Sequence, residues 1–516
     1  MRTKNFIFTV LLVVLILNFA QAKNTANNRG TTDKPNVIFF VLDDLNDWIN
    51  PLGYNQAKTP NLDRLAESGV TFKNAHAPAS YCAPSRTAIF TGLQSTTTGC
   101  YQDEVYHWDY PNLVPLQMAF KQGGYNAFGA GKLFHHRAGF VDLRGWDEFF
   151  ARSQEIKDMG YEMGGRGSDY LTPNPTPYSS YYTKTDKKIT GGSFMEWGPI
   201  ADSLEEKVTA TIRTNWACDV LKKKHEKPFF LALGLYHPHF PNYAPQKYFD
   251  IYDLEKIQVP ELKADDLDDL PEVMRKKMTN RSKIQKMLEE VGAVKEAVQG
   301  YLAAVSYADA MLGRILDTLE DSPYKDNTVV VMWSDQGYHH GEKGNWGKHT
   351  LWKETSHVPL IFAGNNIPKN KTVDATVGLI DLYPTLIELC YLPKQHKMDG
   401  ESLVSSIRKP SSANDRNLFV PYHERGSYAV INSDWRYIYY KEGTEELYNL
   451  EDDPNEWYNL AGKEENKTVI LDLQKAAPVE FSPAATPKKN LNLIIEGDTF
   501  RWEHKTGGLP VGIINR

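Results

Sequence analysis

The sequence predicts an α/β fold: a large, mostly parallel sheet sandwiched by helices, with a smaller C-terminal α+β subdomain built on an antiparallel sheet. Three observations support this prediction. Short apolar runs rich in branched residues alternate with helix-like segments, as in a parallel sheet that is covered on both faces. After residue 400 the composition shifts to Pro, Ser and Asn, followed by strand-like stretches at 428–431 and 435–440. At 516 residues the chain also exceeds what one hydrophobic core usually supports.

Reactive side chains follow four of the apolar runs. Residues 36–42 lead into Asp43 and Asp44, 125–131 into Lys132 and His135, 229–235 into His237 and His239, and 328–333 into Asp335 and Gln336. In open α/β sheets, ligands bind beyond the carboxyl ends of the strands. We therefore expect these side chains to converge on one site although they are far apart in the sequence.

Helical segments are expected between the strands. Residues 203–225 open with a Ser203-x-x-Glu206 capping box and close on lysines, and a second long helix is expected over 294–321. Residues 262–290 are dense in alternating charge, which favours solvated helices over the alternative of a lid above the site.

The N-terminus has the order of a secretory signal: a charged start, an apolar run over residues 6–19, and the small-residue site Ala20-Gln21-Ala22. We expect a signal peptide over 1–22, a catalytic domain over 23–400 and a C-terminal subdomain over 401–516. Export would place the protein in the periplasm or the medium. An uncleaved anchor is the alternative, but the run is short for a bilayer, and no later segment is apolar enough to span one.

Bulk composition excludes some classes of protein. The formal net charge of -7 argues against a nucleic-acid binder, which usually carries a basic excess. Four cysteines in so long a chain do not make a disulfide scaffold.

Cys82 stands at the predicted start of a helix. Pro84 fits its first turn and Gly92 its end, so residue 82 would lie where backbone N–H groups and the helix dipole favour an anion. From these residues alone, Cys82 could be a nucleophile, a disulfide partner or a small buried side chain.

The run Cys82-x-Pro-Ser-Arg86 resembles the signature of the type I, formylglycine-dependent sulfatases, in which a maturation enzyme oxidises the cysteine to formylglycine. Other motifs of that family occur in the expected order, at 43–44 before this run and at 131–135, 237–239, 334–337, 346–348 and 446–457 after it. The residues of the motifs at 131–135 and 237–239 are most similar to those of the iduronate-2-sulfatase branch. The resemblance implies an alkaline-phosphatase-like fold and a sulfuric ester hydrolase.

A divalent cation site is expected at the strand ends. Asp43, Asp44, Asp335 and the side-chain oxygen of Gln336 form an oxygen donor set suited to Ca²⁺, with residue 82 completing the shell. Mg²⁺, which demands a tighter octahedron, is the second choice. Gln336 is a departure from the family pattern, because related sulfatases commonly carry Asn or His there.

The resemblance also implies the reaction. Hydrated formylglycine at residue 82 would attack sulfur through one hydroxyl, and its second hydroxyl would expel sulfate. By the same resemblance, Arg86 and Lys132 would hold the hydrate, His135 would be the base of the second step, His239 and Lys348 would bind sulfate, and His239 would protonate the leaving oxygen.

The expected substrate is a sulfated oligosaccharide derived from an algal polysaccharide or a glycosaminoglycan, and the expected partner is a formylglycine-generating enzyme. One alternative is a phosphodiesterase or phosphonate hydrolase on the same scaffold. The other is a sulfated-glycan binding protein without catalysis.

Overall fold

The computed structural model describes residues 34–135, 142–150, 195–496, 499–507 and 511–515. The predicted signal peptide, residues 1–22, lies outside the described residues. Within the described part of the chain, no helix combines the length and the apolar character needed to cross a membrane.

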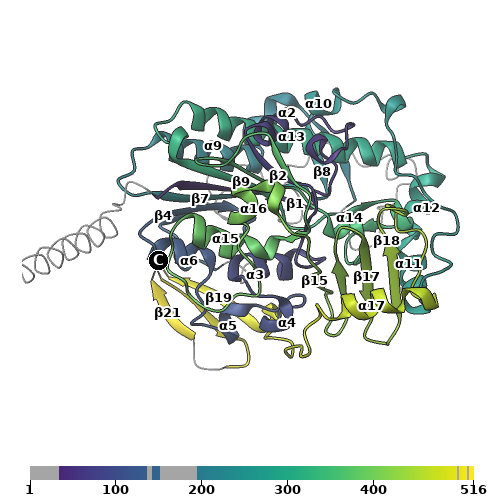
Figure 1. Ribbon diagram of the computed structural model, residues 1–516. Helices are drawn as coiled ribbons and strands as arrows, with labels where there is room; N and C mark the ends of the chain where they lie inside the picture. The colour runs from purple at the N-terminus through teal and green to yellow at the C-terminus, as the bar shows by residue number, and fades with distance from the viewer. Residues whose placement is uncertain (1–33, 136–141, 151–194, 497–498, 508–510, 516) are drawn as a thin grey trace, which may run out of the picture.

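An eight-stranded mixed sheet forms the centre of the molecule (Figure 1), in the order β13-β2-β12-β9-β1-β7-β4-β5. Only β12 runs antiparallel to its neighbours, so the prediction of a mostly parallel sheet is confirmed. The strands are β1 (Asn36–Asp43), β2 (Gly69–Phe72), β4 (Asn126–Gly131), β5 (Glu148–Phe150), β7 (Phe229–Pro238), β9 (Thr328–Ser334), β12 (Leu360–Gly364) and β13 (Lys371–Val373).

Strand β1 shows why this part of the sequence is continuously apolar. It pairs in parallel with β7 on one side and β9 on the other, and all of its residues are buried. Ile38, Phe40 and Leu42 contribute to one hydrophobic core, whereas the alternating residues Val37 and Phe39 contribute to the core on the opposite face. Each face must therefore be covered by helices.

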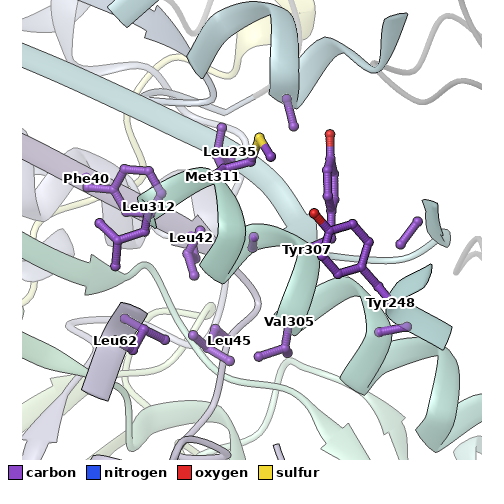
Figure 2. Packing of buried hydrophobic residues seen from close by; sticks show 14 of the residues in the cluster. Phe40, Leu42, Leu45, Leu62, Leu235, Tyr248, Val305, Tyr307, Met311 and Leu312 are labelled. Atoms are coloured by element: carbon purple, nitrogen blue, oxygen red, sulfur yellow. The ribbon is translucent and has the colours of Figure 1, made fainter. Parts of the chain in front are cut away.

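Helices cover the two faces in separate sets (Figure 1). One core includes α2 (Pro60–Glu67), α9 (Thr209–Lys222), α10 (Gln246–Phe249) and α13 (Val294–Glu320), and the other includes α3 (Cys82–Thr91), α6 (Leu116–Gln122), α15 (Leu382–Leu389) and α16 (Val404–Arg408). Figure 2 shows Phe40 and Leu42 of β1 lying close to Met311 and Leu312 of α13. The helix predicted over 294–321 is confirmed.

The helix predicted over 203–225 is wrong at its start. Residues 202–207 form a 3-10 turn, Val208 is extended, and α9 begins at Thr209. Glu206 does not close a capping box, because its carboxylate accepts a hydrogen bond from Asn215 at 2.9 Å and pairs with Arg314 of α13 at 2.8 Å. A tertiary ion pair thus replaces the local cap.

The C-terminal subdomain contains the predicted antiparallel sheet. Its strands are β15 (Leu418–Pro421), β16 (Tyr428–Ile431), β17 (Trp435–Tyr439) and β18 (Glu445–Asn449). Helix α17 (Lys467–Gln474) packs on one face, and α11 (Glu272–Arg281) packs on the other through Met274 and Met278. Helix α12 (Lys283–Glu290) follows α11, so the charged segment 262–290 is largely helical. The boundary near residue 400 stays a prediction.

A further antiparallel sheet brings the end of the chain back towards α3. It consists of β19 (Leu491–Glu496), β20 (Thr499–His504) and β21 (Val511–Asn515). Leu491 packs against Ala83 and Val105, beside the start of α3. The smaller remaining elements include β3 (Ala75–His76), α4 (Ser95–Thr98), α5 (Tyr106–Asp109), β6 (Trp197–Ile200), β8 (Asn242–Pro245), β10 (His339–His340), β11 (Trp346–Gly347), α14 (Lys353–Ser356) and β14 (Val377–Gly378).

Candidate active site

The carboxyl ends of the central strands form the candidate active site, as the position of polar residues in the sequence predicted. Asp43 ends β1 and Asp44 follows it, Asp335 follows β9, and Lys132 follows β4. Cys82 is the first residue of α3, after an extended Tyr81, and Gly92 ends the helix in the left-handed conformation. The helix predicted from Pro84 and Gly92 is therefore present.

Cys82 is almost completely buried among nitrogen donors. Its Sγ lies 3.0 Å from Lys348 Nζ, 3.4 Å from Gln336 Nε2 and 3.8 Å from Lys132 Nζ. Burial raises the pKa of the Cys82 thiol to about 12, against the opposing charges of the two lysines. The unmodified side chain is therefore a protonated thiol at neutral pH, which is a poor nucleophile.

Three buried carboxylates pair with three cationic side chains around Cys82. Asp335 lies 2.7 Å from Arg86, Asp44 lies 2.5 Å from Lys348, and Asp43 pairs with Lys132. Arg86 also reaches Asp43 at 3.2 Å, so its guanidinium joins two strand ends. The cationic partners hold these acidic groups in a water-poor site, where charges interact strongly.

The pKa values of the two carboxylates beside Arg86 move in opposite directions. Although burial acts against it, the charges of Lys132, His239 and Arg86 hold the pKa of Asp43 well below its usual range. Burial raises the pKa of Asp335 above its usual range, and Arg86 compensates for this only in part. The side-chain cations alone therefore leave the carboxylate cluster incompletely compensated.

The same cluster fits a divalent cation. Donor atoms of Asp43, Cys82 and Asp335 lie within 4.8 Å of one another, as do those of Asp43, Asp44 and His239. Among the described residues, the buried Asp44 Oδ2 and Gln336 Oε1 have no hydrogen-bond partner. A buried acceptor left unsatisfied costs about 1–3 kcal/mol. Since the donors are mainly carboxylate and amide oxygens, a hard cation such as Ca²⁺ or Mg²⁺ would satisfy them.

Backbone geometry directs the adjacent aspartates into one site. Asp44 has a φ of 63°, in the left-handed region, and its backbone N–H donates to Asp335 Oδ1 at 3.2 Å. Leu45 N–H donates to Ser334 Oγ at 3.0 Å, which ties the end of β1 to the end of β9. Gln336 Nε2 donates to Asp44 Oδ1, so the longer side chain at this position does reach the cluster.

The two predicted catalytic histidines contact different parts of the site. His239 Nε2 is 3.6 Å from Asp44 Oδ2, and burial lowers the pKa of His239 to about 4, although Asp44 opposes this shift. His135 Nε2 instead lies 3.1 Å from the hydroxyl of Tyr81, the residue before Cys82. The structure thus places His239 against the carboxylates and His135 against the N-terminal side of α3.

Two supporting side chains were not predicted from the sequence. The hydroxyl of Tyr301, on α13, donates to the backbone oxygen of Asp44 at 2.9 Å, and Ser85 Oγ donates to that of Asp335 at 2.5 Å. Tyr301 could have been suspected, because a tyrosine on the apolar face of a helix needs a partner for its hydroxyl. Ser85 lies inside the Cys82 motif, but its acceptor is distant in sequence.

Comparisons with known protein families agree with this geometry. The family model described as Sulfatase matches residues 35–390, and the model described as N-sulphoglucosamine sulphohydrolase, C-terminal, matches 341–478. A protein named "Sulfatase" from Formosa agariphila is 40% identical over 499 residues, which cover 93% of this chain and 92% of that protein. Human iduronate 2-sulfatase is 29% identical over 443 residues, which cover 81% of this chain and 76% of that protein.

Solved structures show the same fold. A phosphonate monoester hydrolase of Agrobacterium radiobacter has a TM-score of 0.67 at 17% identity, covering 86% of this chain and 94% of that one. A structure in complex with its substrate D-glucosamine-2-N,6-O-disulfate has a TM-score of 0.64 at 21% identity, and the match covers 86% of this chain and 98% of that one. The predicted alkaline-phosphatase-like fold is therefore confirmed, although this fold is shared by hydrolases of more than one kind.

Proposed function

Since the chain belongs to the sulfatase family and is a sulfuric ester hydrolase, we propose that it removes sulfate from sulfated oligosaccharides with residue 82 as formylglycine. The observation that carries this proposal is the position of Cys82. A buried thiol with a pKa raised to about 12 is unsuited to nucleophilic attack, yet Lys348 Nζ lies 3.0 Å from its sulfur and two further nitrogen donors face it. Such a site suits an anionic oxygen better than a thiol.

Formylglycine, once formed and hydrated, supplies a nucleophilic hydroxyl, and a divalent cation supplies charge stabilisation as a Lewis acid. Asp43, Asp44, Asp335 and Gln336 would hold the cation, with Ca²⁺ favoured over Mg²⁺. Arg86 is positioned to fix Asp43 and Asp335, because it contacts both carboxylates. Lys132 is 3.8 Å from the sulfur of residue 82 and would hold the charge that develops there.

Three other side chains would act on the sulfate and the leaving group. Lys348 keeps its proton, because Asp44 and neighbouring acidic groups raise its pKa despite burial, so it would bind sulfate as a cation. His239, with a pKa near 4 in the ligand-free protein, is neutral at neutral pH. It would become a proton donor to the leaving oxygen only when the charge of bound sulfate raises that pKa. His135 would serve as the base that regenerates the aldehyde.

Relatives and the predicted export support a carbohydrate substrate. One structural neighbour carries a sulfated sugar as its substrate, and one relative is named for iduronate. A signal peptide over 1–22 would send the protein to the periplasm or medium, where sulfated polysaccharides are available. A formylglycine-generating enzyme would be the maturation partner, and residues 23–400 and 401–516 the catalytic and C-terminal units.

A phosphonate or phosphodiester hydrolase is the second candidate, because a structural neighbour is named a phosphonate monoester hydrolase. The ratio of sulfate to phosphate ester turnover by the purified enzyme separates the two. A ratio below one would favour the second candidate.

Mass spectrometry tests the proposal most directly. The protein is produced with and without a formylglycine-generating enzyme, and the peptide containing Cys82 is analysed for the mass of an aldehyde. Maturation should convert residue 82 and create sulfatase activity in parallel. An unmodified thiol after co-expression with a competent maturation enzyme would contradict the proposal and favour a binding protein without catalysis.

A further inference from the structure

A group of basic side chains that takes no part in the proposed reaction lies beside the active site. Lys277 and Arg281 come from α11, His349 follows Lys348, and His423 lies between β15 and β16. Three of them contact Tyr422: Lys277 donates to its hydroxyl, its hydroxyl donates to the backbone oxygen of His349 at 2.7 Å, and its ring lies 3.8 Å from that of His423. Arg281 contacts the backbone of Lys348, next to His349. The four residues are called the α11 basic cluster. All four are partly buried, so they retain some contact with solvent.

Short contacts connect the α11 basic cluster to the reactive position. Arg281 Nη1 donates to the backbone oxygen of Lys348 at 2.5 Å, and Lys348 Nζ lies 3.0 Å from Cys82 Sγ. The ring of His349 lies 4.8 Å from that of Tyr81, the residue before Cys82. A substrate whose sulfate lies at residue 82 would therefore place its sugar rings close to the cluster.

No carboxylate forms an ion pair with this cluster within the described part of the chain, although the charges of Glu424 and Glu442 partly oppose the lowering of the Lys277 pKa. Neither Lys277 nor Arg281 forms an ion pair there, in contrast to Arg86, Lys132 and Lys348 in the active site. Lys277 donates instead to the hydroxyl of Tyr422 and lies 4.6 Å from the centre of its ring. Glu424, in the same loop as His423, is paired with Lys441 at 2.7 Å.

The arrangement is unfavourable without an anion. Lys277 and Arg281 are four residues apart on α11, and like charges at this spacing destabilise a helix. Burial, together with Arg281, lowers the pKa of Lys277 to about 8. The buried Nδ1 of His423 also lacks a hydrogen-bond partner among the described residues. Cations that are partly desolvated and unpaired beside a ligand site are typical of groups that bind a ligand anion.

We propose that the α11 basic cluster binds a second anionic group of the substrate, a carboxylate or a second sulfate on the same or the neighbouring sugar ring. This inference rests on the proposed function, since it assumes that the first sulfate lies at residue 82. Lys277 and Arg281 would supply the charge, and His423 would supply a hydrogen bond. The enzyme would then select oligosaccharides with at least two negative groups.

Calorimetric binding to the full chain, produced without the maturation enzyme so that no turnover occurs, tests the inference. The probes are three disaccharides that carry the same sulfate. The second ring is neutral in the first, a uronic acid in the second and sulfated in the third. Native protein should bind at least one doubly charged probe about ten- to a hundredfold more tightly than the singly charged one, as expected for a hydrogen bond to a charged group. Which probe binds more tightly distinguishes carboxylate from sulfate.

The Lys277→Met variant should reduce this preference to less than threefold. Lys276→Met is the matched control, because Lys276 is exposed on the same helix and pairs with Glu272 at 2.5 Å; it should keep the native preference. Should Lys277→Met fold poorly, Lys277→Gln retains a donor for Tyr422 without the charge. An absent preference in native protein, or an undiminished one in the Lys277 variants, would overturn the inference.

The binding experiment and the proposed function can fail separately. Preferential binding that depends on Lys277, found in a matured protein that hydrolyses no sulfate ester, would keep the anion site and reject the proposed reaction. Sulfate ester hydrolysis without any preference for doubly charged probes would keep the proposed reaction and reject the anion site.

Discussion

The two basic regions of this molecule differ in how their charges are compensated. Around Cys82, the cations Arg86, Lys132 and Lys348 each contact a buried carboxylate. In the α11 basic cluster, Lys277 and Arg281 contact a hydroxyl and a backbone oxygen instead. The first region is organised by charges within the chain, so it can hold a reacting group in a fixed position before the substrate arrives. In the second region Glu424 and Glu442 act on Lys277 without pairing with it, so a direct counter-charge would have to come from a ligand.

Substitution of Cys82 by Ala should have the largest effect, because it removes the proposed nucleophile. Sulfatase activity of protein co-expressed with the maturation enzyme should fall by about 10⁴- to 10⁶-fold. Binding of doubly charged disaccharides at the α11 basic cluster should persist, since Ala leaves the second region unchanged. Activity is measured in parallel with calorimetric binding; substantial residual turnover would mean that residue 82 is not the nucleophile.

Removal of one arginine from each region should affect stability unequally. Arg86→Met leaves Asp43 and Asp335 without the guanidinium that contacts both, and breaking such a buried pair costs about 3–5 kcal/mol. Arg281→Met removes a donor to a backbone oxygen and leaves no carboxylate without a partner. The free energy of unfolding should therefore fall by only about 1 kcal/mol. Urea unfolding of both variants gives the two free energies. Similar losses would show that the two regions are compensated alike.

The sequence predicted the first region far better than the second. Asp43 and Asp335 directly follow uninterrupted apolar strands, so their convergence follows from the topology of a parallel sheet. Lys277 and Arg281 instead lie in a charged segment that resembles an ordinary solvated helix. The contacts of Arg281 with Lys348 and of Lys277 with Tyr422 depend on how α11 packs on the C-terminal sheet through Met274 and Met278, which no local pattern specifies.

The early start predicted for α9 has a similar physical cause. The pattern Ser203-x-x-Glu206 matches a capping box, but capping competes with any stronger tertiary partner of the glutamate. Here Arg314, more than a hundred residues later, provides that partner. Local signals therefore located the strands and the helix of Cys82, whereas side-chain pairings between distant helices could be obtained only from the structure.

Removal of divalent cations should lower the stability of the protein by acting on the first region only. After treatment with EDTA, addition of Ca²⁺ at about 100 times its dissociation constant should raise the free energy of unfolding by about 2.7 kcal/mol. The gain should vanish in Asp44→Asn and persist in Asp317→Asn, a control in an exposed ion pair with Arg64. Thermal unfolding with Ca²⁺ and with Mg²⁺ shows which ion is preferred. A gain that survives Asp44→Asn would place the cation elsewhere.

The smallest expected effect is the pH dependence contributed by Lys277. Its pKa in the folded protein is about 8, below the usual 10.5, because of burial and the neighbouring Arg281. Between these two values the unfolded chain binds a proton that the folded chain has released, so the folded state gains stability as pH rises through this window. The free energy of unfolding of native protein should therefore increase relative to that of Lys277→Met between pH 7 and pH 10. A constant difference would mean that burial and Arg281 do not lower the pKa of Lys277, and the contrast between the two regions would then rest on Arg281 and His423 alone.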